Sequence, residues 1–438
     1  MSTAAVKSRD AARQRWFVAA LLILFAAISI QYSHKALTNR SAIVRWLEQL
    51  KQWDRGDDIF RDFNYPNPPI MAMILSPLAH LPPVAAALTL FYVKVAMTFA
   101  VFAWVFRLVQ TPECLFPPWA KALTVLLSLR TIAGDLNHGN VNLFILFLVV
   151  GALYAFHRGR DGISGLLLAL AICCKVTPAL FLPYLIWKRA WRTLVACAAG
   201  MLLFLFFVPA LRSGWDTNAK ELSSWVDGMI LPYIQSGVVT SEHQNQSLPG
   251  LVFRLATHSP SFGSFDADNH YQPLRYDNLV TITPPKAHLL IKTCMAAFAL
   301  LVIWACRTPT AGRQGWRLAA EYSIVILGML LFSERTWKHH CVTLVLPFAV
   351  VCYQLATGND SQKMKAFLIG CLAAAGMLIA STSTLAARDD NSLTGAWDHF
   401  GKMAQVYGAF VWAYLVLLAA LIVLLRKKQC DVEGAPAR

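Results

Sequence analysis

Three acidic side chains in polar segments of this apolar chain could each act as a general base: Asp58, Asp135 and Glu334. A carboxylate in such a position can take the proton of an attacking hydroxyl group. An ionisable group near membrane depth costs at least ~2.5–3.5 kcal/mol on insertion scales, so each one calls for an explanation. We rank Asp58 first as the catalytic base, Asp135 second and Glu334 third. The stretch around Asp58 could equally be a solvated loop with charges at its turns.

Cationic and imidazole side chains accompany these acids and could hold a departing phosphate through charge-assisted hydrogen bonds. They are Arg130, Lys175, Lys338, His339 and His340. Lys175 could instead snorkel to the interface, and the two histidines could cap a helix. Adjacent histidines lack the i, i+4 spacing of a zinc pair on a helix, so we predict no metal.

Amide and aromatic side chains near the same segments could contact a sugar. We include as substrate-binding candidates Asn64, Tyr65, His138, Asn140, Asn142, Asn245, Gln246 and Trp337. The segment 130–142 is the densest, with one Arg, one Asp, one His and three Asn. A tight turn between two membrane spans rarely needs so many polar groups, which favours a functional role.

The amino-acid composition predicts which kind of structural element positions these residues. The chain has 438 residues, 57% hydrophobic and 14% charged, whereas about 25% of residues are charged in soluble domains. We therefore predict an all-α polytopic membrane protein. Its ten cysteines lie mostly in apolar runs without CxxC or metal spacing, so we interpret them as small buried side chains.

A helix needs about 20 apolar residues to cross the hydrocarbon core. Ten runs are clear candidates: 17–33, 84–107, 119–133, 141–157, 190–210, 287–306, 318–333, 341–357, 366–386 and 405–425. Basic clusters flank 162–187 at both ends, so we interpret that stretch as two short helices that break at Lys175–Pro178. The prediction is about twelve segments with both termini cytoplasmic, in the plasma (inner) membrane.

This topology divides the chain into a tail (1–16), a catalytic membrane core (17–350), C-terminal transmembrane helices (351–425) and a second tail (426–438). The core contains two long outer loops, 34–83 and 211–286. The predicted cytoplasmic loops carry most of the net charge of +15, which is a topology signal and no indication of nucleic-acid binding. All the polar clusters then fall on the non-cytoplasmic side.

At these segments the sequence resembles glycosyltransferase family 87, membrane mannosyltransferases with the GT-C fold. The family's Tyr-Pro-Pro segment corresponds to Tyr65–Pro69, and its Gly-Gln-Val-Asn element to Gly139–Asn142. A Lys-x-x-Pro helix break stands at Lys175–Pro178, Asn-Gln-Ser at Asn245–Ser247, and Ser-x-x-x-Trp-x-His-His at Ser333–His340. Five motifs in the family's order cover most of residues 60–350.

The resemblance implies transfer of a hexose, most often mannose, from a polyprenyl-phosphate sugar donor to an acceptor hydroxyl, with inversion. It implies no cofactor beyond that lipid-linked donor, and it leaves the glycan or lipid acceptor unknown. The chain departs from the family early in the first outer loop. There the segment 38–42 lacks the usual acid, and Asp54, Asp57, Asp58 and Asp62, or Asp135 or Glu334, could stand in for it.

Two other functions fit part of the pattern. A transporter or lipid flippase often has twelve spans, and Lys175 at a broken helix could be its substrate site. The chain has no internal repeat and its charges gather at one predicted boundary, which weighs against transport. An inactive relative that scaffolds other envelope enzymes would explain the missing early acid.

Overall fold

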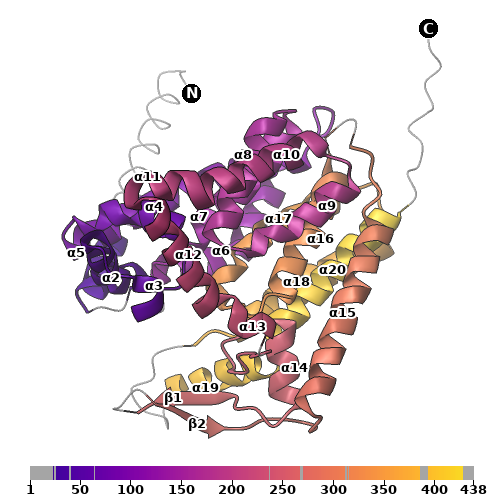
Figure 1. Ribbon diagram of the computed structural model, residues 1–438. Coiled ribbons are helices and arrows are strands. Elements are labelled where there is room, and N and C mark those ends of the chain that lie inside the picture. Colours follow the sequence, from indigo (N-terminus) through magenta and orange to yellow (C-terminus); the bar gives the residue numbers. More distant parts are fainter. Residues whose placement is uncertain are drawn as a thin grey trace, which may run out of the picture.

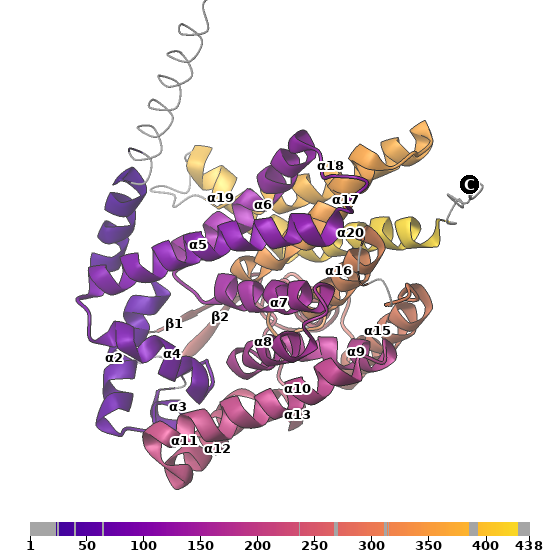
Figure 2. The ribbon, with the colours of Figure 1, turned by 90° about the horizontal axis from the view of Figure 1, so that it is seen from above.

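The computed structural model of the chain describes residue 23 and residues 26–38, 41–63, 65–235, 237–266, 270–310, 313, 315–384 and 393–427. Within this part of the chain, helices form a single bundle (Figures 1 and 2). After a helical stretch over residues 26–37, they are α2 (Ala42–Arg55), α3 (Ile59–Asp62), α4 (Pro69–Ala79), α5 (Pro83–Val109), α6 (Pro118–His138), α7 (Asn142–His157), α8 (Asp161–Cys174), α9 (Phe181–Trp187), α10 (Trp191–Leu202), α11 (Val208–Ser213), α12 (Trp215–Met229), α13 (Leu231–Gln235), α14 (Leu248–Ala256), α15 (Pro284–Ala305), α16 (Trp316–Leu331), α17 (Val345–Thr357), α18 (Gln362–Ser381), α19 (Leu393–Val406) and α20 (Ala409–Arg426). One antiparallel hairpin, β1 (Phe262–Phe265) with β2 (Tyr271–Arg275), is an exception to the all-α prediction.

Six helical segments in the described part are long and apolar enough to cross a membrane. They are Pro83–Val109, Trp191–Ser213, Pro284–Ala305, Lys338–Thr357, Gln362–Ser381 and Ala409–Arg426. A multi-pass helical membrane protein is therefore supported, but the count of twelve spans is not confirmed. The predicted span 318–333 falls in α16, which has only 16 residues. The predicted span 119–133 falls in α6, which is less apolar.

The middle of the bundle is formed by α16 and α17, whose side chains are almost all buried. The outer helices α10 and α15 instead bury few residues, and large apolar side chains such as Val195, Leu289 and Leu300 stay exposed. On a membrane protein, a surface with so many exposed apolar side chains is the one expected to contact lipid.

The helix break at Lys175 is confirmed. α8 ends at Cys174, Lys175 has an extended backbone, and a 3₁₀ turn over Thr177–Leu180 leads into α9. Gly165 lets α8 lie against α10, because a Cβ there would come within 2.5 Å of the Thr193 carbonyl oxygen. Contact between these two short helices holds the broken segment inside the bundle.

The two long predicted outer loops fold into helices of their own. The loop 34–83 contains α2, α3 and α4, and the loop 211–286 contains α12, α13, α14 and the hairpin. In Figure 1, α13, α14, α19 and the hairpin gather at the lower end of the bundle.

At the opposite end of the bundle, ion pairs join connecting segments to helices: Arg313 pairs with Asp161 of α8 at 2.5 Å, and Lys188 pairs with Glu321 of α16 at 2.6 Å. The assignment of this end to the cytoplasm stays a prediction. The predicted tails, 1–16 and 426–438, lie outside the described residues except for Arg426 and Lys427.

Candidate active site

A cavity of about 400 Å³ lies where the two loop regions meet the ends of α6, α8 and α16. We call it the central cavity. Seven residues that the sequence singled out line it: His138, Asn140, Lys175, Glu334, Trp337, His339 and His340. These residues come from three segments up to about 200 positions apart, and the fold brings them to one place.

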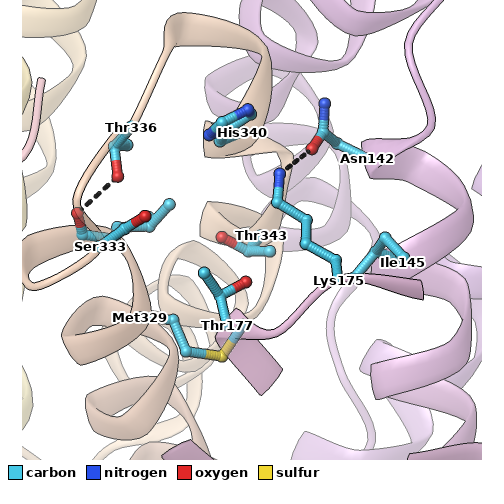
Figure 3. Close-up of a pocket in the computed structure, with 10 residues that line it drawn as sticks. Asn142, Ile145, Lys175, Thr177, Met329, Ser333, Thr336, His340 and Thr343 are labelled. Carbon is cyan, nitrogen blue, oxygen red and sulfur yellow. Dashed lines mark hydrogen bonds between the residues drawn. The ribbon is translucent and has the colours of Figure 1, made fainter. Parts of the chain in front are cut away.

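Lys175 enters this site because the chain leaves helical geometry after Cys174. Its Nζ donates a hydrogen bond of 2.6 Å to Oδ1 of Asn142, and Figure 3 shows the two side chains facing each other beside His340. A small pocket that these three residues help to line adjoins the central cavity. The ammonium group of Lys175 is thus held at the cavity wall.

Asn142 is itself held by a buried ion pair. Asp135 accepts hydrogen bonds from Nδ2 of Asn142 (3.0 Å) and from the backbone N–H of Leu143 (3.3 Å). The other charge is Lys94 of α5, whose Nζ lies 2.7 Å from the Asp135 carboxylate, with both side chains at most 1% exposed. A chain of contacts therefore runs from Lys94 through Asp135 and Asn142 to Lys175.

The turn between α6 and α7 depends on Gly139, which has a φ of +71° and ends α6 in the left-handed conformation. Any side chain at this position would also overlap the side chain of Ser41. The turn directs Asn140 toward the cavity, where its Nδ2 lies 3.3 Å from Nε2 of His339. Its Oδ1 accepts a hydrogen bond from the N–H of Val141, which fixes the side chain.

His138 and His339 stack with ring centroids 4.3 Å apart and an interplanar angle of 18°. His340 lies edge-on to His339, at 4.8 Å. Burial, assisted by the positive charges of Arg45 and Lys35, lowers the pKa of His138 to about 4. His138 is therefore neutral at pH 7, so it offers a ring face and hydrogen-bonding nitrogens rather than a charge.

Glu334 is the one carboxylate among the described residues that line the central cavity. Its Oε1 accepts hydrogen bonds from the hydroxyl (3.1 Å) and N–H (3.4 Å) of Thr240, and its Oε2 lies 3.8 Å from Nε of Arg335. Burial raises the pKa of Glu334 above the ordinary value of 4.5. A carboxylate with a raised pKa is a stronger proton acceptor when it is ionised.

The two other predicted bases are occupied elsewhere. Asp58 is the N-cap of α3, where it accepts a hydrogen bond from the N–H of Arg61 (3.2 Å) and another from the hydroxyl of Ser224 (2.7 Å). Asp135 is fully buried in its ion pair. Neither lines the central cavity, so of the three acids only Glu334 faces it.

Arg130 and Lys338 line a second cavity, of about 370 Å³. Arg130 donates to the carbonyl of Ile379 and the hydroxyl of Thr382, each at 3.0 Å, and Lys338 donates to the Thr382 carbonyl at 3.0 Å. A third cavity of about 320 Å³ adjoins it and includes polar side chains of α19. His138 and His339 line all three cavities.

Asn245 is fully buried and does not line the central cavity. Its Nδ2 donates to the carbonyls of Thr240 and Glu334, both at 2.8 Å, and its Oδ1 accepts from the N–H of Thr336 at 2.9 Å. These bonds join the long loop to the segment that carries Glu334. The structure thus places Asn245 behind the cavity wall rather than on its surface.

Gln246 has a similar position, because its Nε2 donates to the carbonyl of Gln405 (2.8 Å) and its Oε1 accepts from the N–H of Phe410 (3.4 Å). Nearby, the buried guanidinium of Arg254 donates to five backbone carbonyls, the shortest being the 2.7 Å bond to Val406. Sequence reasoning missed Arg254, since one arginine in an amphipathic helix gives no such signal.

The Tyr-Pro-Pro segment contributes Pro66, Asn67 and Pro68 to the wall of the central cavity. Tyr65 is buried between Trp46 and Phe60, which meet its ring edge-on, and Asn67 reaches the cavity. Asn64, a predicted site residue, lies outside the described residues.

Sequence reasoning also missed several residues that line the central cavity: Arg45, Trp46, Asn67, Trp225, Tyr233 and Arg335. Most lie on amphipathic loop helices where aromatic and basic residues are common. Two of them lie within the motifs named from the sequence, where their positions could have revealed them: Asn67 in Tyr65–Pro69 and Arg335 in Ser333–His340.

The fold is that of a multi-pass helical membrane protein, and its central cavity combines one carboxylate with several cationic side chains. The chain belongs to glycosyltransferase family 87, whose model matches residues 65–334. It is therefore a glycosyltransferase. Of the functions considered from the sequence, this finding supports the enzyme rather than a transporter or lipid flippase.

Two relatives are similar to this chain over most of its length. Both are polyprenol-phosphate-mannose-dependent alpha-(1-2)-phosphatidylinositol mannoside mannosyltransferases. The protein from Mycobacterium tuberculosis is 30% identical over 376 residues, which are 82% of this chain and 76% of the relative. The protein from Mycolicibacterium smegmatis is 25% identical over 373 residues, 82% and 75% of the two chains. No solved structure gives a significant match.

Proposed function

We propose that this protein transfers mannose from a polyprenyl-phosphate carrier to an acceptor hydroxyl in the central cavity, with inversion at the anomeric carbon. The relatives' dependence on polyprenol-phosphate-mannose supports the choice of donor. The plasma membrane is its proposed location, with the cavity on the non-cytoplasmic side. The observation that carries the proposal is the meeting of one carboxylate, several cations and indole rings in a single cavity.

The cations would hold the donor's phosphate. Arg45, Lys175 and Arg335 line the cavity, and each can donate charge-assisted hydrogen bonds to phosphate oxygens. During transfer the bond between C1 of the sugar and the phosphate oxygen breaks. Its electron pair leaves with polyprenyl phosphate, whose additional negative charge these cations stabilise.

Glu334 is the proposed general base. The acceptor oxygen forms the new bond to C1 while its proton passes to the Glu334 carboxylate. Thr240 and Arg335 hold the carboxylate in place, and its raised pKa suits proton transfer near neutral pH. The indole rings of Trp46, Trp225 and Trp337 in the wall offer faces on which a sugar ring can stack.

The test compares Glu334→Gln with Asp58→Asn in purified protein, with transfer of labelled mannose as the readout. We expect Glu334→Gln to lower kcat by about 10²–10⁴-fold, the usual contribution of a general base, while donor binding is kept. Asp58→Asn should stay active, since asparagine also serves as an N-cap. The matched control is Glu48→Gln, which changes an acid of α2 with a 61% exposed side chain.

The pH profile supplies a second readout. Wild-type kcat should fall as the pH drops through the raised pKa of Glu334, and this acidic limb should vanish in the residual activity of Glu334→Gln. An active Glu334→Gln variant together with an inactive Asp58→Asn variant would assign the base to Asp58. If the wild-type protein is inactive with polyprenyl-phosphate-mannose, this result would instead support the alternative of an inactive relative that scaffolds other envelope enzymes.

A further inference from the structure

The Asn-Gln-Ser motif contains one side chain that has no part in the reaction proposed above. Asn245 is 0% exposed and lies behind the wall of the central cavity. An asparagine amide can donate two hydrogen bonds and accept two, and Asn245 forms all four. Its Nδ2 donates to the carbonyls of Thr240 and Glu334, both at 2.8 Å. Its Oδ1 accepts from the N–H groups of Thr336 (2.9 Å) and Ser247 (3.1 Å).

The amide of Asn245 joins the two backbones that carry the proposed base and its hydroxyl partner. Because one nitrogen donates to both carbonyls, the Thr240 segment cannot move away from Glu334 unless one of these bonds breaks. A backbone bond of 2.6 Å from the N–H of Gln246 to the carbonyl of Thr336 reinforces the contact. Aspartate has no N–H donors for the two carbonyls, and glutamine is longer by a methylene group. Asparagine is therefore the side chain that this position can use.

The hydroxyl of Thr240 is committed to the carboxylate of Glu334. A hydroxyl group has one hydrogen to donate and two lone pairs that accept. Arg335 donates to Oγ1 of Thr240 from Nε (3.2 Å) and from Nη2 (2.7 Å). The hydroxyl hydrogen is then left for Oε1 of Glu334, at 3.1 Å, and the N–H of Thr240 faces the same oxygen at 3.4 Å. Since both bonds occupy Oε1, we expect Oε2 to be the oxygen that takes the proton.

We propose that Asn245 is a positioning residue of the transfer reaction, which acts through Thr240 and contacts neither the sugar nor the phosphate. It keeps the hydroxyl and the N–H of Thr240 on Oε1 of Glu334. The inference rests on the proposed function, because it takes Glu334 as the general base. Without these two donors the carboxylate would lose its fixed orientation, and its ionised form would be less stabilised.

The test is a double-variant cycle of Asn245→Ala and Thr240→Val in the full-length protein in detergent, with transfer of labelled mannose measured across pH. Valine keeps the shape of threonine and the carbonyl that Asn245 binds, but it removes the hydroxyl. We expect each single variant to lower kcat about tenfold, the effect of one lost hydrogen bond to a charged group, and to change KM for the donor less than kcat. The double variant should be no slower than the slower single variant, because both changes act on the same carboxylate.

The pH profile separates positioning from a loss of stability. The acidic limb of kcat should move to higher pH in both single variants, because the pKa of Glu334 rises when its carboxylate loses a donor. Thr240→Ser keeps the hydroxyl and should keep the wild-type profile. The matched control is Asn218→Ala, since Asn218 is 1% exposed and its Nδ2 also donates to two backbone carbonyls, at 3.0 and 3.4 Å. This control should lower stability without moving the acidic limb.

Hydrogen–deuterium exchange reports on the same contacts without relying on transfer. Asn245→Ala should raise exchange at the N–H of Thr336, which loses its acceptor, whereas Thr240→Val should leave that exchange unchanged. Should the alanine variant fail to fold, Asn245→Asp takes its place in the cycle, because aspartate keeps the acceptor and loses only the two donors.

Three results would overturn the proposal. The first is a double variant in which the two losses of kcat multiply, since Asn245 would then act independently of Thr240. The second is an Asn245 variant that keeps the wild-type kcat and pH profile. The third is an Asn218→Ala variant whose acidic limb moves as far as that of Asn245→Ala. An active Glu334→Gln variant would instead overturn the assignment of the base, which none of these three results does, so the two failures are distinguishable.

Discussion

The buried pair of Lys94 and Asp135 offers the sharpest test of how the site is built. We change Lys94→Met and Asp135→Asn separately and together. Methionine fills a similar volume without charge, and asparagine keeps one oxygen as an acceptor for Asn142. In the single variant Lys94→Met, the Asp135 carboxylate would stay fully buried, and its remaining hydrogen-bond donors among the described residues would be the N–H groups of Asn142 and Leu143.

The expected loss of unfolding free energy follows from the burial of both charges. Lys94 is 1% exposed and Asp135 is 0% exposed, with 2.7 Å between Nζ and the carboxylate. Removing one partner of such a pair costs about 3–5 kcal/mol, because an uncompensated charge stays in the interior. The double variant removes both charges, so its loss should be smaller than that of either single variant. The control Lys51→Met breaks an exposed 3.9 Å pair and should cost less than about 1 kcal/mol.

The assay is equilibrium unfolding in mixed micelles, followed by tryptophan fluorescence, together with donor binding for each variant. Because Asp135 orients Asn142 and Asn142 holds Lys175, donor affinity should fall in the single variants and recover partly in the double variant. A loss of less than about 1 kcal/mol in each single variant, or a double variant that is the least stable of the three, would show that Lys94 and Asp135 do not compensate each other's buried charge.

Two further predictions concern the turn and its histidine. The pKa of His138 is lowered from 6.5 to about 4, so the folded protein resists its protonation: its stability is complete above pH 6.5 and falls by up to about 3 kcal/mol as the pH drops toward 4. His138→Phe should reduce the slope of unfolding free energy against pH in that window, and an unchanged slope would mean that His138 does not titrate there on unfolding. Gly139→Ala should cost at least ~1 kcal/mol, because alanine is strained at positive φ and overlaps Ser41. Its unfolding midpoint measures this loss, which Gly134→Ala, on an open face of α6, should not show.

The sequence alone determined the class of the protein and the helix break at Lys175–Pro178, within the apolar stretch 162–187. Low charge and long apolar runs require a helical membrane protein, because lipid cannot satisfy an exposed backbone. The Lys175–Pro178 break was readable since proline and a buried cation both oppose a continuous span. Four of the five family motifs marked segments that line the central cavity, whereas Asn245–Ser247 lies behind its wall. The number of spans was less readable, because short helices such as α16 can be buried by neighbours instead of by lipid.

Only the tertiary structure decided what each polar residue does. Asp58, Asp135 and Glu334 look alike in sequence, yet one caps a helix, one neutralises a buried lysine and one faces the cavity. Asn245 and Asn140 are both loop amides, but only Asn140 reaches the cavity surface. The physical reason is that a polar side chain's role depends on which partners surround it, and those partners come from segments far away in the chain. Their placement depends on how α5, α6 and the loop helices pack, which local sequence does not specify.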